Sequence, residues 1–146
     1  MARDAFACVH RLRVRWAEVD RQDIVFNGHY LTYFDVAVTE YWRSIGMQYP
    51  ERIVSLGIDL YAVKSTVEYH APALYDDWLD VHIRCARLGR TSLRFVLEIW
   101  RGDDHLVTGE LIYVTADPAE RKSRPVPAPL RAAITAYERT LPETAA

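Results

Sequence analysis

The chain has 146 residues, of which 50% are hydrophobic and 26% are charged. This length is close to the usual size of one domain, so we expect a single domain over residues 1–146. The formal net charge of -2 gives no overall electrostatic reason to expect a nucleic acid or an anionic membrane as partner. The sequence has no membrane-length apolar run or secretory signal, and Cys8 and Cys85 lack metal-binding spacing. We therefore expect a cytoplasmic protein with reduced thiols and no metal.

The first predicted strand leads directly into the first predicted helix. Alternation gives the strand one face of arginines and one inward face, which holds His10, Leu12, Val14 and Trp16. A helix is predicted over residues 27–45, because Asn27 can cap its start and Gly46 follows its end. Its apolar stripe is wider than that of a surface helix, so we expect other elements to wrap it. The stripe consists of Tyr30, Leu31, Phe34, Val36, Ala37, Val38, Tyr41, Trp42 and Ile45.

Four strands with no helix between them are predicted next, over residues 61–69, 79–85, 93–99 and 106–114. In the first of these, the alternating residues are Tyr61, Val63, Val67 and Tyr69. Gly102-Asp103-Asp104 predicts a hairpin turn between the last two strands. A short amphipathic C-terminal helix is predicted from Leu130, Ile134, Tyr137 and Leu141. This order cannot make alternating βαβ units, so we expect an α+β fold with an antiparallel sheet curled round the long helix.

The carboxylate of Asp20 lies between the first strand and the helix. A helix start presents unpaired N–H groups and the positive end of the helix dipole, which suits a developing oxyanion. Asp20 is close enough in sequence to act on a carbonyl held there. The alternative is that Asp20 is only a turn residue at a strand end. Its neighbour Glu18 is predicted to be a solvated or arginine-paired carboxylate rather than a second catalyst.

Residues 18–30, from Glu18-Val19-Asp20 to Gly28-His29-Tyr30, resemble the opening signature of the 4-hydroxybenzoyl-CoA thioesterase family of hotdog-fold acyl-CoA thioester hydrolases. The resemblance continues through Val67-Glu68-Tyr69 and Gly89-Arg90-Thr91-Ser92 and spans about residues 9–118. It implies a hotdog fold, hydrolysis of an acyl-CoA to a carboxylic acid and coenzyme A, and no cofactor. It also implies a homo-oligomer in which two sheets join edge to edge, as a dimer that commonly doubles into a tetramer.

The resemblance also implies roles for residues near the helix start. Asp20 would be the nucleophile or general base, and the backbone N–H of Asn27 would polarise the thioester carbonyl, although Asn27 could serve only as a helix cap. His29 is expected to be structural, with direct proton transfer as the alternative. Asp23 stands where the family usually has glycine, and aspartate tolerates the left-handed backbone that glycine allows. Asp23 and the aromatic Phe26 are predicted to contact substrate.

A second predicted contact with substrate is the segment Arg90-Thr91-Ser92, between two predicted strands. It is either a plain hairpin turn or a phosphate contact, since Arg90 supplies a permanent forked cation and the hydroxyl residues supply donors. In the resembling family, the corresponding loop binds the nucleotide end of coenzyme A. The aromatic residues that could line an acyl pocket or pack the core are Tyr33, Trp42, Tyr61 and Tyr69.

Other chemistries have no sequence support, because the chain lacks a nucleophile-elbow serine, zinc-protease histidine spacing and phosphate-binding glycine patterns. Two alternatives to an acyl-CoA thioesterase remain open. One is a thioesterase that acts on acyl groups attached to a carrier protein. The other is a non-catalytic hotdog module that binds acyl groups without turning them over.

Overall fold

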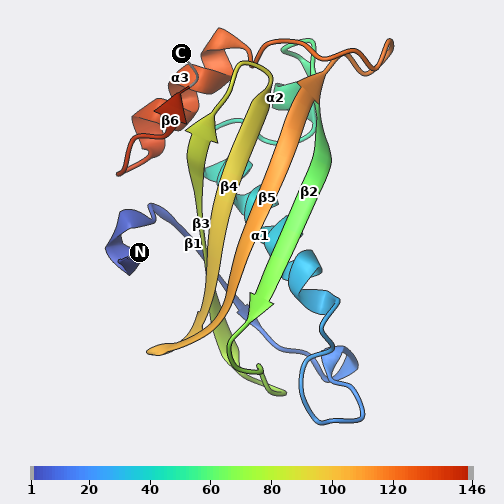
Figure 1. Cartoon of the computed structure of the whole chain (residues 1–146), viewed down its shortest axis with the longest axis vertical. Coiled ribbons are helices and arrows are strands. Elements are labelled where there is room, and N and C mark those ends of the chain that lie inside the picture. The colour runs from blue at the N-terminus through green and yellow to red at the C-terminus, as the bar shows by residue number, and fades with distance from the viewer. Residues whose placement is uncertain (1, 145–146) are drawn as a thin grey trace.

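A computed structural model describes residues 2–144, and it shows a sheet with one long helix, α1, against one of its faces (Figure 1). The long elements are β1 (Cys8–Arg13), α1 (His29–Ser44), β2 (Asp59–Tyr69), β3 (Trp78–Leu88), β4 (Ser92–Arg101), β5 (Asp104–Ala116) and α3 (Ala128–Tyr137). The short ones are η1 (Arg3–Ala5), η2 (Trp16–Glu18), α2 (Glu51–Val54) and β6 (Glu143–Thr144). The strand order is β1-β3-β4-β5-β2, with all neighbours antiparallel, and β6 pairs with β3 in parallel. The predicted α+β hotdog architecture is confirmed.

The core lies between α1 and the inner face of the sheet. Alternate residues of β3 and β4 point toward the helix and are fully buried: Leu79, Val81, Ile83, Cys85, Leu93, Phe95, Leu97 and Ile99. The antiparallel register sets Ile83 opposite Leu97 and Cys85 opposite Phe95, so the apolar side chains of the two strands form one surface. From α1, Phe34, Ala37 and Tyr41 are buried against this surface. The period-2 pattern of the sequence is therefore the pattern of burial.

Gly109 of β5 lets α1 approach the sheet closely. A Cβ atom built on Gly109 would overlap the ring of Phe34. Gly109 pairs with Leu97 on one side and with Val67 on the other, so it lies within the sheet rather than at an edge. Glycine weakens a strand interior unless another group needs the space. Here the aromatic ring of α1 needs that space.

Three apolar residues do not lie where the sequence pattern predicted. Trp16 was expected on the inner face of the first strand, but β1 ends at Arg13 and Trp16 lies in η2, 70% exposed, with its ring against Tyr75. Leu141 was expected on the C-terminal helix, but α3 ends at Tyr137 and Leu141 is 68% exposed. Val63 was expected to share a face with Val67. A bulge between Ala62 and Lys64 adds one residue to β2, so the alternation of side chains between the two faces changes phase there.

The C-terminal helix is anchored by a buried carboxylate just beyond its end. Oε2 of Glu138 accepts hydrogen bonds from the Tyr41 hydroxyl at 2.8 Å and from the Cys85 backbone N–H at 2.6 Å. Burial raises the pKa of Glu138 above its ordinary value. Three segments that are far apart in sequence, α1, β3 and the end of α3, are thereby tied together. Both cysteines are free and buried.

We expect Gly109→Ala to destabilise the fold, because the new methyl group must displace Phe34 from a packed core. Overpacking of this kind costs about 1–3 kcal/mol. Urea unfolding would measure the loss. Phe34→Leu should relieve part of the clash, so the double variant should be less destabilised than the sum of the two single variants. Additive effects would show that Gly109 and Phe34 do not compete for the same space.

Candidate active site

Asp20 lies in a tight turn that leaves one of its carboxylate oxygens available. Its backbone N–H donates to the Ile24 carbonyl and its own carbonyl accepts from the Asp23 N–H, both at 2.9 Å. Its Oδ1 accepts from the Gln22 N–H at 2.7 Å. Among residues 2–144, no hydrogen bond occupies Oδ2. The turn therefore fixes the carboxylate through one oxygen and leaves the other free for chemistry.

The backbone of Asp23 confirms the prediction made for this turn. Its φ angle is +62°, in the left-handed region that glycine adopts without strain. Aspartate enters this region with less penalty than most residues. The turn of the family signature thus forms here without the usual glycine.

Asp20 lines a pocket of about 260 Å³ at the end of the molecule where α1 begins and β2 ends (Figure 1). The other lining residues are Gln22, Ile24, Val25, Asn27, Tyr30, Tyr69, His70, Ala71 and Pro72. Two segments about fifty residues apart in sequence thus line the same pocket. They are joined by a hydrogen bond of 2.9 Å from the Val25 N–H to the Ala73 carbonyl and by one of 3.2 Å from the Tyr69 hydroxyl to the Asn27 carbonyl.

Asn27 lines the pocket but is not the helix cap that the sequence predicted. The helix begins at His29, and the capping position is Gly28, which makes no side-chain cap bond. The His29 N–H donates to the Phe26 carbonyl at 3.0 Å. The backbone N–H of Asn27 has no hydrogen-bond partner among the described residues. Asn27, with its unpaired backbone donor, and Asp20, with its free carboxylate oxygen, therefore line the same pocket.

Glu18 holds the Asp20 loop against α1. It is 6% exposed, and Oε1 accepts hydrogen bonds from the Arg15 N–H at 2.7 Å and the Tyr33 hydroxyl at 3.0 Å. Oε2 pairs with the Arg15 guanidinium at 3.0 Å. Burial opposes ionisation, but these hydrogen bonds hold the pKa of Glu18 below its ordinary value. The predicted pairing with an arginine is confirmed, while the burial and the contact with α1 were not predicted.

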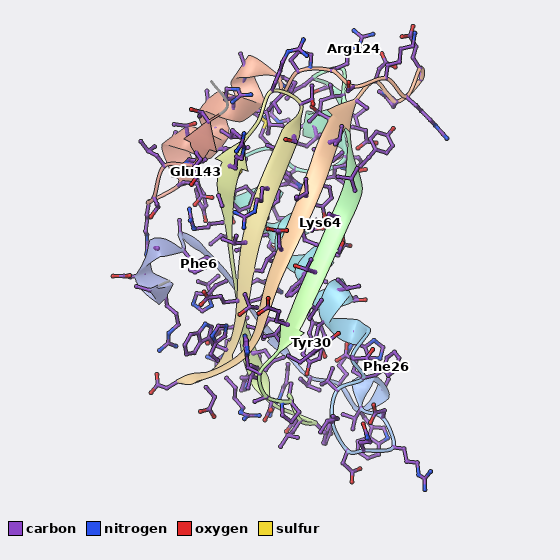
Figure 2. All side chains as sticks on the ribbon, in the orientation of Figure 1. Phe6, Phe26, Tyr30, Lys64, Arg124 and Glu143 are labelled. Atoms are coloured by element: carbon purple, nitrogen blue, oxygen red, sulfur yellow. The ribbon has the colours of Figure 1, made fainter. Side chains whose placement is uncertain are left out.

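Three other predicted site residues lie beside this pocket, not in its lining. Asp23 and Phe26 are exposed on the loop, and His29 is the first residue of α1. The Phe26 and His29 rings pack edge to face, with 5.6 Å between their centroids. Figure 2 shows Phe26 and Tyr30 at the same end of the molecule, near the start of α1. Of the aromatic residues considered for an acyl pocket, Tyr69 lines this one, and Tyr33 and Trp42 are buried in the core.

The Arg90-Thr91-Ser92 segment lies at the opposite end of the sheet, in the hairpin between β3 and β4 (Figure 1). The hairpin closes with a 2.8 Å hydrogen bond from the Gly89 N–H to the Ser92 carbonyl. Arg90 is exposed, and its carbonyl accepts from the Val126 N–H at 2.8 Å. Within one chain, this hairpin and the Asp20 pocket are therefore not brought together.

A larger hollow of about 560 Å³ lies on the outer face of the sheet, away from α1. Its charged side chains largely neutralise one another. Glu110 pairs with Lys64 at 3.1 Å and with Arg94 at 2.6 Å. Lys64 lies midway along β2 in Figure 2, well away from Tyr30 and the loop before α1. Glu68 also lines this hollow and has no hydrogen-bond or ion-pair partner among the described residues, but the hollow lies away from the start of α1 and the Asp20 loop.

Sequence analysis missed the wall of the pocket formed by Tyr69, His70, Ala71 and Pro72. Tyr69 was considered as a residue that could line an acyl pocket, but the three residues that follow it were assigned no role. His70 carried no local signal, because a lone histidine at a strand end has no diagnostic spacing. Residues 2–144 contain no group of three or more His, Cys, Asp or Glu side chains that could hold a metal ion.

Comparison with known proteins places this chain in a family. The family model described as Thioesterase superfamily matches residues 22–108. The chain belongs to the thioesterase superfamily. It is 32% identical over 95 residues to a putative esterase from Aquifex aeolicus, covering 65% of this chain and 73% of that protein. It is 28% identical over 117 residues to the acyl-CoA thioester hydrolase YbgC of Escherichia coli, covering 80% of this chain and 87% of that one.

Solved structures agree with the fold of this thioesterase superfamily member. A 1,4-dihydroxy-2-naphthoyl-CoA thioesterase from Synechocystis superposes with a TM-score of 0.79 at 23% identity, covering 87% of this chain and 94% of that chain. The predicted resemblance to hotdog thioesterases is confirmed. Among residues 2–144, no helix is both long enough and apolar enough to cross a membrane.

We expect Glu18→Gln to lower the free energy of unfolding at pH 7 by roughly 1–3 kcal/mol, because a buried charge-assisted network is broken. The folded protein holds the pKa of Glu18 low, so this stabilisation is present above the ordinary value of 4.5 and is lost as the pH falls through the folded pKa. The difference in free energy of unfolding between variant and wild type should therefore become smaller at acidic pH.

Urea unfolding at pH 7 and near pH 4 would measure this gap. The matched control is Glu40→Gln, which removes the carboxylate of a solvent-facing ion pair with Arg43 on α1. Its effect should stay within about 0.5 kcal/mol. If the difference in free energy of unfolding between the Glu18 variant and the wild type were the same at both pH values, the assigned role would be contradicted.

Proposed function

We propose that this chain is an acyl-CoA thioesterase, which converts an acyl-CoA and water into a carboxylic acid and free coenzyme A. The observation that carries the proposal is that one pocket is lined both by Asp20, which has a carboxylate oxygen free of hydrogen bonds, and by Asn27, whose backbone N–H is unpaired among the described residues. The name of the Escherichia coli relative, an acyl-CoA thioester hydrolase, supports the choice of substrate. No cofactor is needed, because a thioester carbonyl is already activated. We place the enzyme in the cytoplasm, in keeping with its free cysteines.

In the proposed reaction, the Asp20 carboxylate acts on the thioester carbonyl. It either attacks the carbon and expels the coenzyme A thiolate, giving a mixed anhydride that water then hydrolyses, or removes a proton from a water that attacks the carbon, after which the C–S bond breaks. In both routes the departing thiolate takes up a proton to give free coenzyme A. Both routes pass through a tetrahedral oxyanion. The Asn27 N–H and the positive end of the α1 dipole stabilise that charge. Asp23 and Phe26 on the loop and His29 at the start of α1 flank the site, where they border the entering substrate.

We propose further that the enzyme is a homo-oligomer built on the β2 edge. β2 is the last strand in the sheet order, and one side of it is unpaired among the described residues. Three exposed apolar side chains lie on this strand: Tyr61, Val63 and Tyr69. A long edge strand with exposed apolar residues favours pairing with another strand. A dimer joined through β2, and a tetramer made of two such dimers, would cover these residues.

Antiparallel pairing of two β2 edges also gives the 89–92 hairpin a role. Such pairing turns the second copy end for end, so its hairpin lies at the same end of the joined sheet as the first copy's pocket. Arg90 is exposed and carries a permanent charge. We propose that this hairpin, in the partner subunit, contacts the phosphates of a coenzyme A whose thioester occupies the Asp20 pocket.

We expect Asp20→Asn to lower kcat at least about a hundredfold, because the amide keeps the shape of the side chain but removes the charge. Release of free thiol from a panel of short, medium, long and aryl acyl-CoAs would measure the loss. Asp23→Gly is the matched control, since it restores the family's usual residue in the same turn and should retain activity. Near-wild-type turnover by the Asp20 variant would disprove the assignment.

The same assay separates the alternatives. Faster hydrolysis of the same acyl group on a carrier protein than on coenzyme A would indicate a carrier-protein thioesterase. Tight acyl-CoA binding without turnover by the wild-type protein would indicate a non-catalytic module.

We expect Arg90→Ala to raise KM for acyl-CoA and to change kcat little, because a remote phosphate contact is equally strong in the ground and transition states. The effect should weaken at high salt. The control substrate is an acyl-N-acetylcysteamine, which has a thioester but no nucleotide, and on which variant and wild type should behave alike. Equal losses on both substrates would instead indicate a structural role for the hairpin.

A further inference from the structure

The outer face of the sheet has no covering layer over β4, β5 and β2. Figure 1 shows α1 behind the sheet and no described element in front of these three strands. At one end of this face, Tyr61 lies opposite Val114, and Val63 beside them is 61% exposed. These residues line an apolar hollow of about 490 Å³. A sheet face turned to water is normally polar, so the apolar hollow indicates that another surface covers this one.

Charged side chains of the outer face lie in two rows that run across the strands. The antiparallel register defines both rows, because it places residues of neighbouring strands directly opposite one another. The acidic row consists of Glu68 on β2, Thr108 on β5 and Glu98 on β4. The basic row consists of Lys64 on β2, Ile112 on β5 and Arg94 on β4. The rows are four residues apart along each strand, which corresponds to about 13 Å.

The two rows differ in charge, although the 560 Å³ hollow that they line is neutral as a whole. Its charged lining residues are Lys64, Arg84, Arg94, Glu68, Glu98 and Glu110. In the acidic row, Glu68 is exposed and has no hydrogen-bond or ion-pair partner among the described residues. In the basic row, Lys64 and Arg94 share one carboxylate, that of Glu110, and their side chains remain 56% and 41% exposed. One end of the hollow therefore has excess negative charge and the other has excess positive charge.

We infer from this pattern that a second copy of the chain covers the outer face, stacked on it with its strands turned end for end. A two-fold axis across the strands sets Glu68 opposite the partner's Lys64 and Glu98 opposite the partner's Arg94, and each contact occurs twice. An axis along the strands would instead set the acidic rows against each other, which like-charge repulsion opposes. The charge pattern thus selects both the occupant and its orientation.

The same rotation brings apolar surfaces together at the two ends of the face. Tyr61 and Val114 lie beyond the basic row, whereas the stacked rings of Trp100 and His105 lie beyond the acidic row. Because the rows are exchanged, the rings of the partner's Trp100 and the partner's His105 meet the apolar hollow that Tyr61 lines. Aromatic rings bury a large apolar area, so these contacts stabilise the stack while the charges orient it.

The area of the face is sufficient when two sheets are joined through β2. β2 has 11 residues, so β2, β5 and β4 make an uncovered face of about 36 by 14 Å, or roughly 500 Å². Two chains joined edge to edge double this to about 1,000 Å², above the roughly 800 Å² per partner of a standard stable interface. Antiparallel β2 pairing also reverses the rows of the second subunit, so two stacked dimers bring opposite charges together throughout. The inference rests on the β2 dimer of the proposed function and assigns the face through which two such dimers form a tetramer.

Charge reversal in either row tests the stack, with mass measured by sedimentation equilibrium of the full chain. We expect Glu68→Lys and Lys64→Glu each to leave dimers, with the tetramer dissociation constant raised at least about tenfold, because like charges then meet. The double variant exchanges the two signs on β2 and should restore the tetramer. Glu51→Lys is the matched control, since Glu51 on α2 is exposed and lines neither hollow. It changes the net charge as Glu68→Lys does and should remain tetrameric.

The outcomes separate this inference from the proposed function. Tetramers in both single variants, or a double variant no more tetrameric than the single ones, would overturn the inference. A wild-type protein that stays dimeric at all concentrations would also overturn it, but would leave the β2 dimer in place, whereas a wild-type monomer would overturn both. Thioester hydrolysis, measured on the same samples, decides the proposed chemistry independently of the number of chains in the assembly.

Discussion

The structure depends on the packing of one face of α1 against the inner face of the sheet. The helix contributes large aromatic side chains, and the sheet makes room for one of them, Phe34, by having no side chain at Gly109. This contact allows a short distance between α1 and the strands beneath it. The start of the helix is fixed in turn at the end of β2. The candidate site is formed where these two ends meet, so its geometry follows from core packing.

The Asp20 loop is attached by hydrogen bonds to both layers of the fold. Glu18 ties it to Tyr33 of α1, and Val25 ties it to Ala73 in the segment that follows β2. A loop held at several points can keep a carboxylate aimed at a substrate without needing to close over it. The left-handed backbone at Asp23 completes this turn. It shows that the family's glycine can be replaced when the new residue tolerates the same backbone angles.

The two faces of the sheet carry different kinds of side chain, and the candidate site lies at the end of the edge strand β2. The inner face is apolar and packs on α1, whereas the outer face carries ion pairs and a stacked Trp100–His105 pair. His70 follows the last residue of β2 and contacts both the outer-face cluster and the pocket. The unpaired β2 edge beside it is also the surface on which we propose that a second copy pairs. A substrate site at such an edge can draw residues from two subunits.

The sequence by itself determined the order of the elements, the inner faces of β3 and β4, the turn at Asp23 and the family. These features depend on local backbone preferences, on side-chain periodicity and on a contiguous signature, all of which can be seen within a short window. Only the tertiary structure decided that Asn27 precedes the helix cap, that a bulge splits the faces of β2, and that the β3–β4 hairpin lies at the opposite end of the sheet from the start of α1 within one chain. It also brought His70 to the pocket. Strand register, bulges and the meeting of distant segments depend on contacts between residues dozens of positions apart, which no local pattern encodes.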